Sequence, residues 1–262
     1  MVTQHVASTH THHTQACFSL PRYLLVVFAM SWPFQGCIFF WPDAIWASKM
    51  LLVSMVMVTV GTYIARKYLF HDTFADAGWR WGKPRHYLAA FVLPVFLWVV
   101  PTLIAGRLGM QPLSTDIHGR DIFIDFLLSL LVTLIPAFGE EFGWRGYLLP
   151  RLLQSHSVRN ALLIHAGIWW AWHLPVLIFT GMHTPVIEGK TLLSVTVVLL
   201  ISLIPSMMHA VVFAYFWSAS SSLAVVTVYH AAFDEIRDTT EHAVGISPLV
   251  NLWQMMFLTL LG

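Results

Sequence analysis

Apolar stretches separated by short polar segments recur along nearly the whole chain. They cover residues 22–42, 44–65, 87–106, 122–139, 160–180, 191–217, 220–235 and 247–261. A helix needs roughly 20 residues to cross a bilayer, and the last two stretches are short for this. Backbone groups in lipid must be hydrogen-bonded internally, and no barrel-like alternation is visible, so the stretches predict spanning helices. We expect an all-α, polytopic membrane helix bundle with about eight transmembrane helices.

The composition agrees with this class of protein. Hydrophobic residues make up 57% of the chain and charged residues only 10%. The mean hydropathy is +0.70. The formal net charge is +1, and no basic face or arm is present, so nucleic acid is not an expected partner. Cys17 and Cys37 fit no metal-ligand spacing.

The chain divides into a polar tail and one apolar domain. Residues 1–19 are polar and rich in histidine, and no basic segment leads directly into an apolar one. We therefore expect a mobile tail rather than a signal peptide. Residues 20–262 contain no Gly- or Ser-rich linker and no internal repeat. They predict a single membrane-embedded domain, with a motif-bearing core at 122–236.

Charges in the connecting segments predict the orientation. The positive residues that join the second to the third span, and the fourth to the fifth, are Arg66, Lys67, Arg80, Lys83, Arg85, Arg145, Arg151 and Arg159. Such residues concentrate on the cytoplasmic side of a membrane. The segments containing Arg107 and Arg237 carry mixed charge and are expected on the opposite side. Both termini are therefore predicted to be cytoplasmic.

Ionisable residues within or beside the apolar stretches are the candidate functional residues. Such groups are costly in a bilayer and usually face the interior of a bundle. They are Asp125, Glu140, Glu141, Arg145, His165, His173, His209, His230, Asp234 and Glu235. Packing is the favoured interpretation for His209, and His165 has no supporting context.

Helix geometry separates Glu140 from Glu141. Successive residues are about 100° apart around a helix, so the two carboxylates point in different directions. Glu141 and Arg145 are four residues apart in the favourable order, and we expect them to pair. Glu140 has no such partner nearby, and an unpaired carboxylate in an apolar site can accept or donate a proton near neutral pH. Alternatively, both carboxylates lie in interfacial water at the cytoplasmic end.

Two histidines have neighbours at helical spacing. Trp169 precedes His173 by four residues, and Pro175 follows where it can open the helix. His230 and Asp234 are four residues apart on one face, so the carboxylate can orient the imidazole or share a ligand with it. The alternative for each histidine is a hydrogen-bonded packing role inside the bundle.

The order EEFGWR, WAWH and HAAFD resembles the three motifs of the CPBP intramembrane protease family. This family includes type II CAAX prenyl endopeptidases and lysostaphin resistance protein A-like proteins. Its first motif is two glutamates, three residues and an arginine, matched by Glu140, Glu141 and Arg145. Its second motif is an aromatic residue, three residues and a histidine, matched by Trp169, in place of the usual Phe, and His173.

The third motif is a histidine, three residues and Asn or Asp, matched by His230 and Asp234. Asp234 replaces the Asn of the prenyl endopeptidases. Because an ionised Asp cannot donate a hydrogen bond, Asp234 would orient His230, be protonated, or contribute to a metal site.

The resemblance implies an eight-helix bundle with a cavity reached from the cytoplasm. It also implies hydrolysis of a peptide bond in a membrane protein or peptide. The expected partners are therefore that substrate and the lipid bilayer.

 Glu140 would activate a water molecule together with His173, and His230 with Asp234 would stabilise the intermediate. Glu141, Arg145 and Trp169 are expected to support the site.

No cofactor is expected. The family is described both as metalloproteases and as glutamate-type proteases without a metal, and the HExxH arrangement is absent here. The alternative is a Zn²⁺ ion held by Glu140, His173, His230 and Asp234. The similarity of the first motif region to bacterial members implies a bacterial cell membrane, and the substrate and its prenylation stay open.

Two functions without proteolysis are the alternatives. A membrane scaffold or a bacteriocin-immunity-type protein could keep this fold without catalysis. A proton- or cation-coupled transporter would also bury Glu, His and Asp side chains. Transport is less favoured, because the sequence shows no repeated pair of interrupted helices.

Overall fold

The computed structural model describes residues 18–110, 119–183, 189–244 and 248–261. The predicted tail, apart from its last two residues, lies outside this part of the chain. The helices are α1 (Leu20–Phe40), α2 (Ile45–Ile64), α3 (Pro84–Pro94), α4 (Val100–Arg107), α5 (Gly119–Glu141), α6 (Leu149–Ser155), α7 (Val158–Trp172), α8 (Leu174–His183), α9 (Thr191–Ser220), α10 (Leu223–Val244) and α11 (Pro248–Leu261). Three π-helical segments, η1 (Ala65–Phe70), η2 (Val95–Val99) and η3 (Phe142–Leu148), continue α2, α3 and α5.

Five helical stretches are long and apolar enough to cross a membrane. They are Leu20–Phe40, Ile45–Phe70, Pro84–Arg107, Gly119–Ser155 and Thr191–Ser220. The pair α7 and α8, bent by 49°, adds a sixth if it forms one span. The chain is thus an integral membrane protein, and the all-α bundle is confirmed.

The expected count of about eight spans is not confirmed, since the described residues contain five or six. The two stretches that fall short are α10 and α11. The C-terminal half of α10 is strongly charged, and α11 has only 14 residues. A helix enclosed by other helices can be apolar on its buried face without crossing lipid, so these two helices are not counted as spans.

The fourth helix extends well beyond the apolar stretch at 122–139, since α5, η3 and α6 form one helical stretch of 37 residues. Arg145 and Arg151 therefore lie within a helix, not in a connecting loop, and both side chains are buried. Arg151 is neutralised by Asp72 and Asp76, at 2.5 and 3.2 Å. Paired charges of this kind do not need water, so they do not end the helix.

Arg237 corrects a second expectation. From its charge pattern it was expected in a mixed-charge connecting segment, whereas it lies within α10, seven residues before the end of that helix. Its guanidinium pairs with Asp234 and Asp238. The charges that served to orient the chain thus include arginines that lie within helices and are paired with carboxylates.

Two glycines allow α2 and α5 to pack closely. A methyl group added at Gly139 would lie 2.7 Å from the Cα atom of Val56, and one added at Gly143 would lie 2.5 Å from Val58 Cγ1. Thr59 Oγ1 also donates a hydrogen bond of 2.8 Å to the Gly139 carbonyl. Because α2 covers the glycine side, the two glutamates between these glycines project from other sides of the helix.

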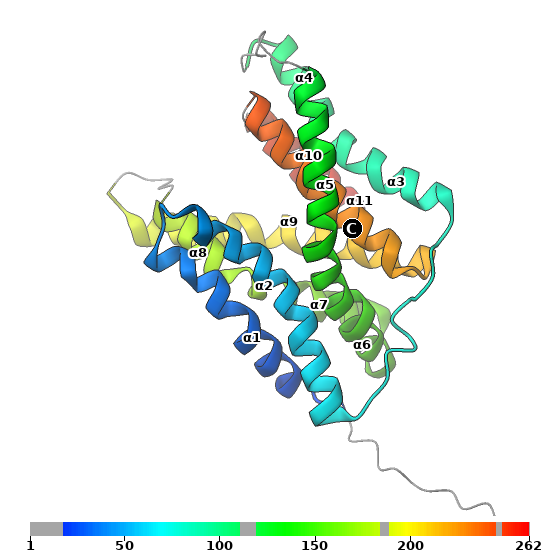
Figure 1. The fold of residues 1–262 in the computed structure, drawn as a ribbon. Coiled ribbons are helices and arrows are strands. Elements are labelled where there is room, and N and C mark those ends of the chain that lie inside the picture. The colour runs from blue at the N-terminus through cyan, green and yellow to red at the C-terminus, as the bar shows by residue number, and fades with distance from the viewer. Residues whose placement is uncertain (1–17, 111–118, 184–188, 245–247, 262) are drawn as a thin grey trace, which may run out of the picture.

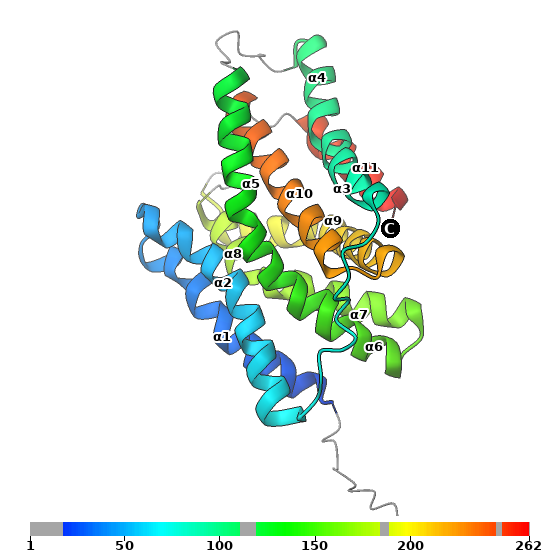
Figure 2. The same ribbon diagram turned by 45° about the vertical axis from the view of Figure 1, so that its right-hand side comes forward.

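The position of α5 organises the bundle. It runs through the centre of the molecule (Figure 1), and Figure 2 shows α1 and α2 on one side of it and α10 and α3 on the other. α7 and α9 pack against each other, and α8 also packs against α9. The three helices that carry the sequence motifs, α5, α7 and α10, are thereby brought to one interior region.

Candidate active site

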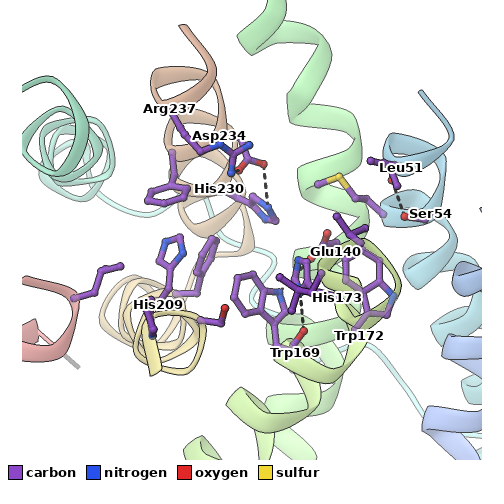
Figure 3. Close-up of a pocket in the computed structure, with 18 of the residues that line it drawn as sticks. Leu51, Ser54, Glu140, Trp169, Trp172, His173, His209, His230, Asp234 and Arg237 are labelled. Atoms are coloured by element: carbon purple, nitrogen blue, oxygen red, sulfur yellow. Dashed lines mark hydrogen bonds and ion pairs between the residues drawn. The ribbon is translucent and has the colours of Figure 1, made fainter. Parts of the chain in front are cut away.

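A cavity of about 430 Å³ lies within the bundle. Its wall contains Glu140 of α5, His173 at the break between α7 and α8, and His230 and Asp234 of α10 (Figure 3). The four residues for which the resemblance implies catalysis therefore border one space. Apolar and aromatic side chains form most of the remaining wall.

Glu140 is buried, with 2% of its surface exposed. Its Oε2 atom accepts a hydrogen bond of 3.2 Å from the indole nitrogen of Trp169. Within the described residues it forms no ion pair, in contrast to its neighbour Glu141. A carboxylate that borders a cavity and has a neutral donor on one oxygen keeps the other oxygen available for a ligand.

The break between α7 and α8 fixes His173. The backbone N–H of His173 bonds to the Trp170 carbonyl at 3.0 Å, which leaves the Trp169 carbonyl without its usual i+4 donor. The His173 ring fills that position, with Nδ1 at 2.7 Å from the Trp169 carbonyl. Pro175 contributes to the break, since it has no N–H to continue the helical pattern. A carbonyl can only accept, so Nδ1 carries the proton and the neutral ring has its lone pair on Nε2.

Glu141 connects the first and third motifs. The expected pair with Arg145 is present, with 2.8 Å between Glu141 Oε1 and Arg145 Nη1. The same oxygen lies 2.8 Å from His230 Nδ1, and both carboxylate and guanidinium are fully buried. The Arg145 guanidinium also lies over the Phe213 ring, 4.3 Å from its centre. The link to His230 was missed, because no local spacing reports a contact between residues on different helices.

Asp234 lies between His230 and Arg237. Its Oδ2 atom is 3.4 Å from His230 Nε2, and its Oδ1 atom is 3.1 Å from Arg237 Nη1. Of the three roles that the sequence left open, this geometry favours orientation of the imidazole. Arg237 also borders the cavity and was not among the candidates. Its spacing of three residues from Asp234 was the signal that could have identified it.

The other ionisable candidates lie in different surroundings. His209 of α9 borders the same cavity, and its Nε2 atom is 2.9 Å from the Tyr229 hydroxyl. His165 is buried against the Trp144 carbonyl and is not part of the cavity wall. Asp125 and Glu235 instead border a second cavity of about 700 Å³, between α5 and α10.

The alternative zinc set does not fit this arrangement. Across the described ranges, no group of three or more His, Cys, Asp or Glu side chains is placed to hold a metal ion.

Comparison with known proteins agrees with the motifs. Residues 122–236 match the family described as type II CAAX prenyl endopeptidase Rce1-like. CAAX prenyl protease 2 of Methanococcus maripaludis is 31% identical over 65 residues, which cover 25% of this chain and 24% of that protein. The matched region thus spans about a quarter of this relative. Residues 122–236, which carry the three motifs on α5, α7 and α10, are thus similar to CPBP-type intramembrane proteases of the CAAX prenyl endopeptidase group.

Proposed function

We propose that this chain is an intramembrane endopeptidase that hydrolyses a peptide bond in a membrane-associated protein or peptide. The observation that carries the proposal is that Glu140 and His173 border the same cavity. Glu140 is a buried carboxylate that forms no ion pair within the described residues, and the His173 imidazole is oriented by the Trp169 carbonyl. The match of residues 122–236 to the type II CAAX prenyl endopeptidase family supports the same reaction class.

Glu140 and His173 would prepare the water molecule. Glu140 accepts one proton from it, and the lone pair on His173 Nε2 accepts a hydrogen bond from its second hydrogen. The water oxygen then attacks the carbonyl carbon of the scissile peptide bond. As the tetrahedral intermediate collapses, Glu140 returns its proton to the leaving nitrogen, so the carboxylate is regenerated and an acid and an amine are released.

His230 would stabilise the negative oxygen of that intermediate. Its contact with Asp234 is long, at 3.4 Å, so the Nε2 hydrogen can also be donated to a substrate oxygen. Glu141 accepts from the opposite nitrogen at 2.8 Å and fixes the direction of the ring. Glu141 and Asp234 thereby position His230, and Arg145 balances the charge of Glu141. Every step uses side chains alone, and we assign no metal to the reaction.

The proposed substrate approaches from the membrane. The relative from Methanococcus maripaludis is named a CAAX prenyl protease. The cavity wall contains several apolar side chains, among them Leu51, Val176 and Leu177. These features make a lipidated C-terminal peptide the first substrate to test, with an unmodified membrane peptide as the alternative. We further propose a bacterial cell membrane as the location, with both termini in the cytoplasm.

The test uses purified protein in liposomes and two internally quenched peptides. Both end in the same CAAX sequence, and only one carries a farnesyl group on its cysteine. Glu140→Gln is expected to lower the cleavage rate at least about 100-fold, the usual contribution of a general base. Glu235→Gln is the matched control, since this glutamate borders the second cavity, and its rate should stay within about twofold of wild type.

Each alternative function gives a different result. Retention of the wild-type cleavage rate by Glu140→Gln would refute the proposed role of Glu140. If the protein is a non-catalytic scaffold, the wild-type protein should cleave neither peptide. Membrane proteins should then also be identical in cells that carry wild-type protein and cells that carry Glu140→Gln protein. A transporter predicts substrate-dependent flux across the liposome membrane instead.

A further inference from the structure

Gln35 of α1 borders the same cavity, yet the reaction described above does not use it. Its side chain is fully buried. Both the Nε2 and the Oε1 atoms are buried, and within the described residues neither has a hydrogen-bond partner. Among the residues of the cavity wall, it thus offers an unused donor and an unused acceptor on one rigid group.

Contacts between α1 and the end of α7 hold together two of the segments that border the cavity, and these segments carry Gln35 and His173. The indole nitrogen of Trp172, the residue before His173, donates a hydrogen bond of 2.7 Å to Ser31 Oγ. Trp32 returns a hydrogen bond of 3.0 Å to the Trp172 carbonyl. Ser31 and Gln35 are four residues apart on α1 and therefore lie on one face. The contacts of Ser31 and Trp32 therefore hold the turn of α1 that precedes Gln35 against the end of α7.

An unsatisfied carboxamide at this place is energetically unfavourable. A buried polar group without a partner costs about 1–3 kcal/mol, and a methionine of similar size would avoid that cost. Ser54, another polar residue of the wall, shows the ordinary solution, since its hydroxyl is bonded to the Leu51 carbonyl at 2.6 Å. A partner supplied by a ligand would account for Gln35.

We propose that Gln35 binds the backbone N–H and C=O of one substrate residue close to the scissile bond. This inference rests on the proposed function. The carboxamide matches these two groups, which point to the same side of an extended chain, since Nε2 donates to the substrate carbonyl and Oε1 accepts from the substrate N–H. Gln35 touches the substrate backbone and takes no part in proton transfer. It therefore positions the substrate independently of side-chain identity, and it favours an extended segment whose backbone groups are free.

The first test compares Gln35→Met with Ser54→Ala in the farnesylated peptide assay. Two lost hydrogen bonds correspond to a fall in kcat/KM of about 10- to 100-fold, carried mainly by a higher KM. Ser54→Ala should stay within about twofold, because its hydroxyl already has a protein partner. A purely structural Gln35 would give a lower melting temperature in the methionine variant, whereas a substrate-binding Gln35 gives an unchanged or higher one.

Ester substitution in the peptide gives a second, more specific test. Replacing one backbone N–H at a time by oxygen removes a single donor from the substrate. At the position bound by Gln35, the ester should weaken cleavage by wild-type protein several-fold and leave cleavage by Gln35→Met unchanged. Equal effects of every ester on the two proteins would overturn the proposal, as would a Gln35→Met variant with wild-type kcat/KM.

Binding can be separated from catalysis. Fluorescence anisotropy of a labelled farnesylated CAAX peptide, measured in Glu140→Gln protein with and without Gln35→Met, reports affinity alone. The double variant should bind at least about tenfold more weakly. Equal affinities would refute the role of Gln35, even if Glu140 proves essential. Cleavage by Glu140→Gln would instead refute the proposed function, and the anisotropy would still decide about Gln35.

Discussion

Glu141 is the residue whose removal tests the buried charge network most directly. Its Oε1 atom is 2.8 Å from both Arg145 Nη1 and His230 Nδ1, and no part of the side chain is exposed. Glu141→Leu keeps a similar volume and removes both contacts. It leaves the Arg145 guanidinium buried without its ion-pair partner, where two of its nitrogens already have no hydrogen bond.

The expected loss follows from that burial. Removing one member of a buried ion pair lowers the free energy of unfolding by about 3–5 kcal/mol. Glu241→Leu is the matched control, because Glu241 is exposed on α10, and the change there should be within about 0.5 kcal/mol. The measurement is equilibrium unfolding of detergent-solubilised protein, followed by the fluorescence of its tryptophans.

A double variant separates the uncompensated charge from the lost packing. In Glu141→Leu with Arg145→Met, both charges are gone, so the double variant should be more stable than Glu141→Leu alone. It should still be catalytically impaired, since His230 has lost the acceptor for Nδ1. A free energy of unfolding of Glu141→Leu within about 1 kcal/mol of wild type would contradict this role of the buried charges. A double variant that is less stable than Glu141→Leu would contradict it as well.

Three further predictions concern packing, the third motif and metal. Gly139→Val should lower the free energy of unfolding by about 3 kcal/mol, since its Cβ would meet the α2 backbone. Gly36→Ala is the control in the same unfolding experiment, and it should not lower the free energy of unfolding, because the space around its Cβ is open. Asp234→Asn should keep the rate of peptide cleavage within about tenfold of wild type, because the amide oxygen can still orient His230. Asp234→Leu should lower that rate about 100-fold. Equal losses in the two variants would show that the carboxylate charge is needed. Dialysis against 1,10-phenanthroline should leave peptide cleavage unchanged, and loss of activity together with one equivalent of zinc would contradict the metal-free mechanism.

Local sequence patterns predicted much of the membrane bundle. Long apolar stretches predicted an all-α membrane domain, and the spacing of Glu141 and Arg145 predicted their ion pair. The count of spans is not confirmed at α10 and α11, where charge or length departs from that of a membrane-crossing helix. The helix also continues beyond the apolar stretch that ends at Gly139, and Arg151 within it is paired with Asp72, a residue far away in the sequence.

By itself, the sequence determined the helical class, the candidate residues and the contacts within single helices, because apolar content and the helical period are local properties. Only the tertiary structure decided that Glu141 holds His230, that the α7 break frees the Trp169 carbonyl for His173, and that Gln35 borders the same cavity. These relations join separate helices or depend on how a helix is interrupted. The close packing of side chains from several helices fixes these relations, so they cannot be predicted from residue spacing along one helix.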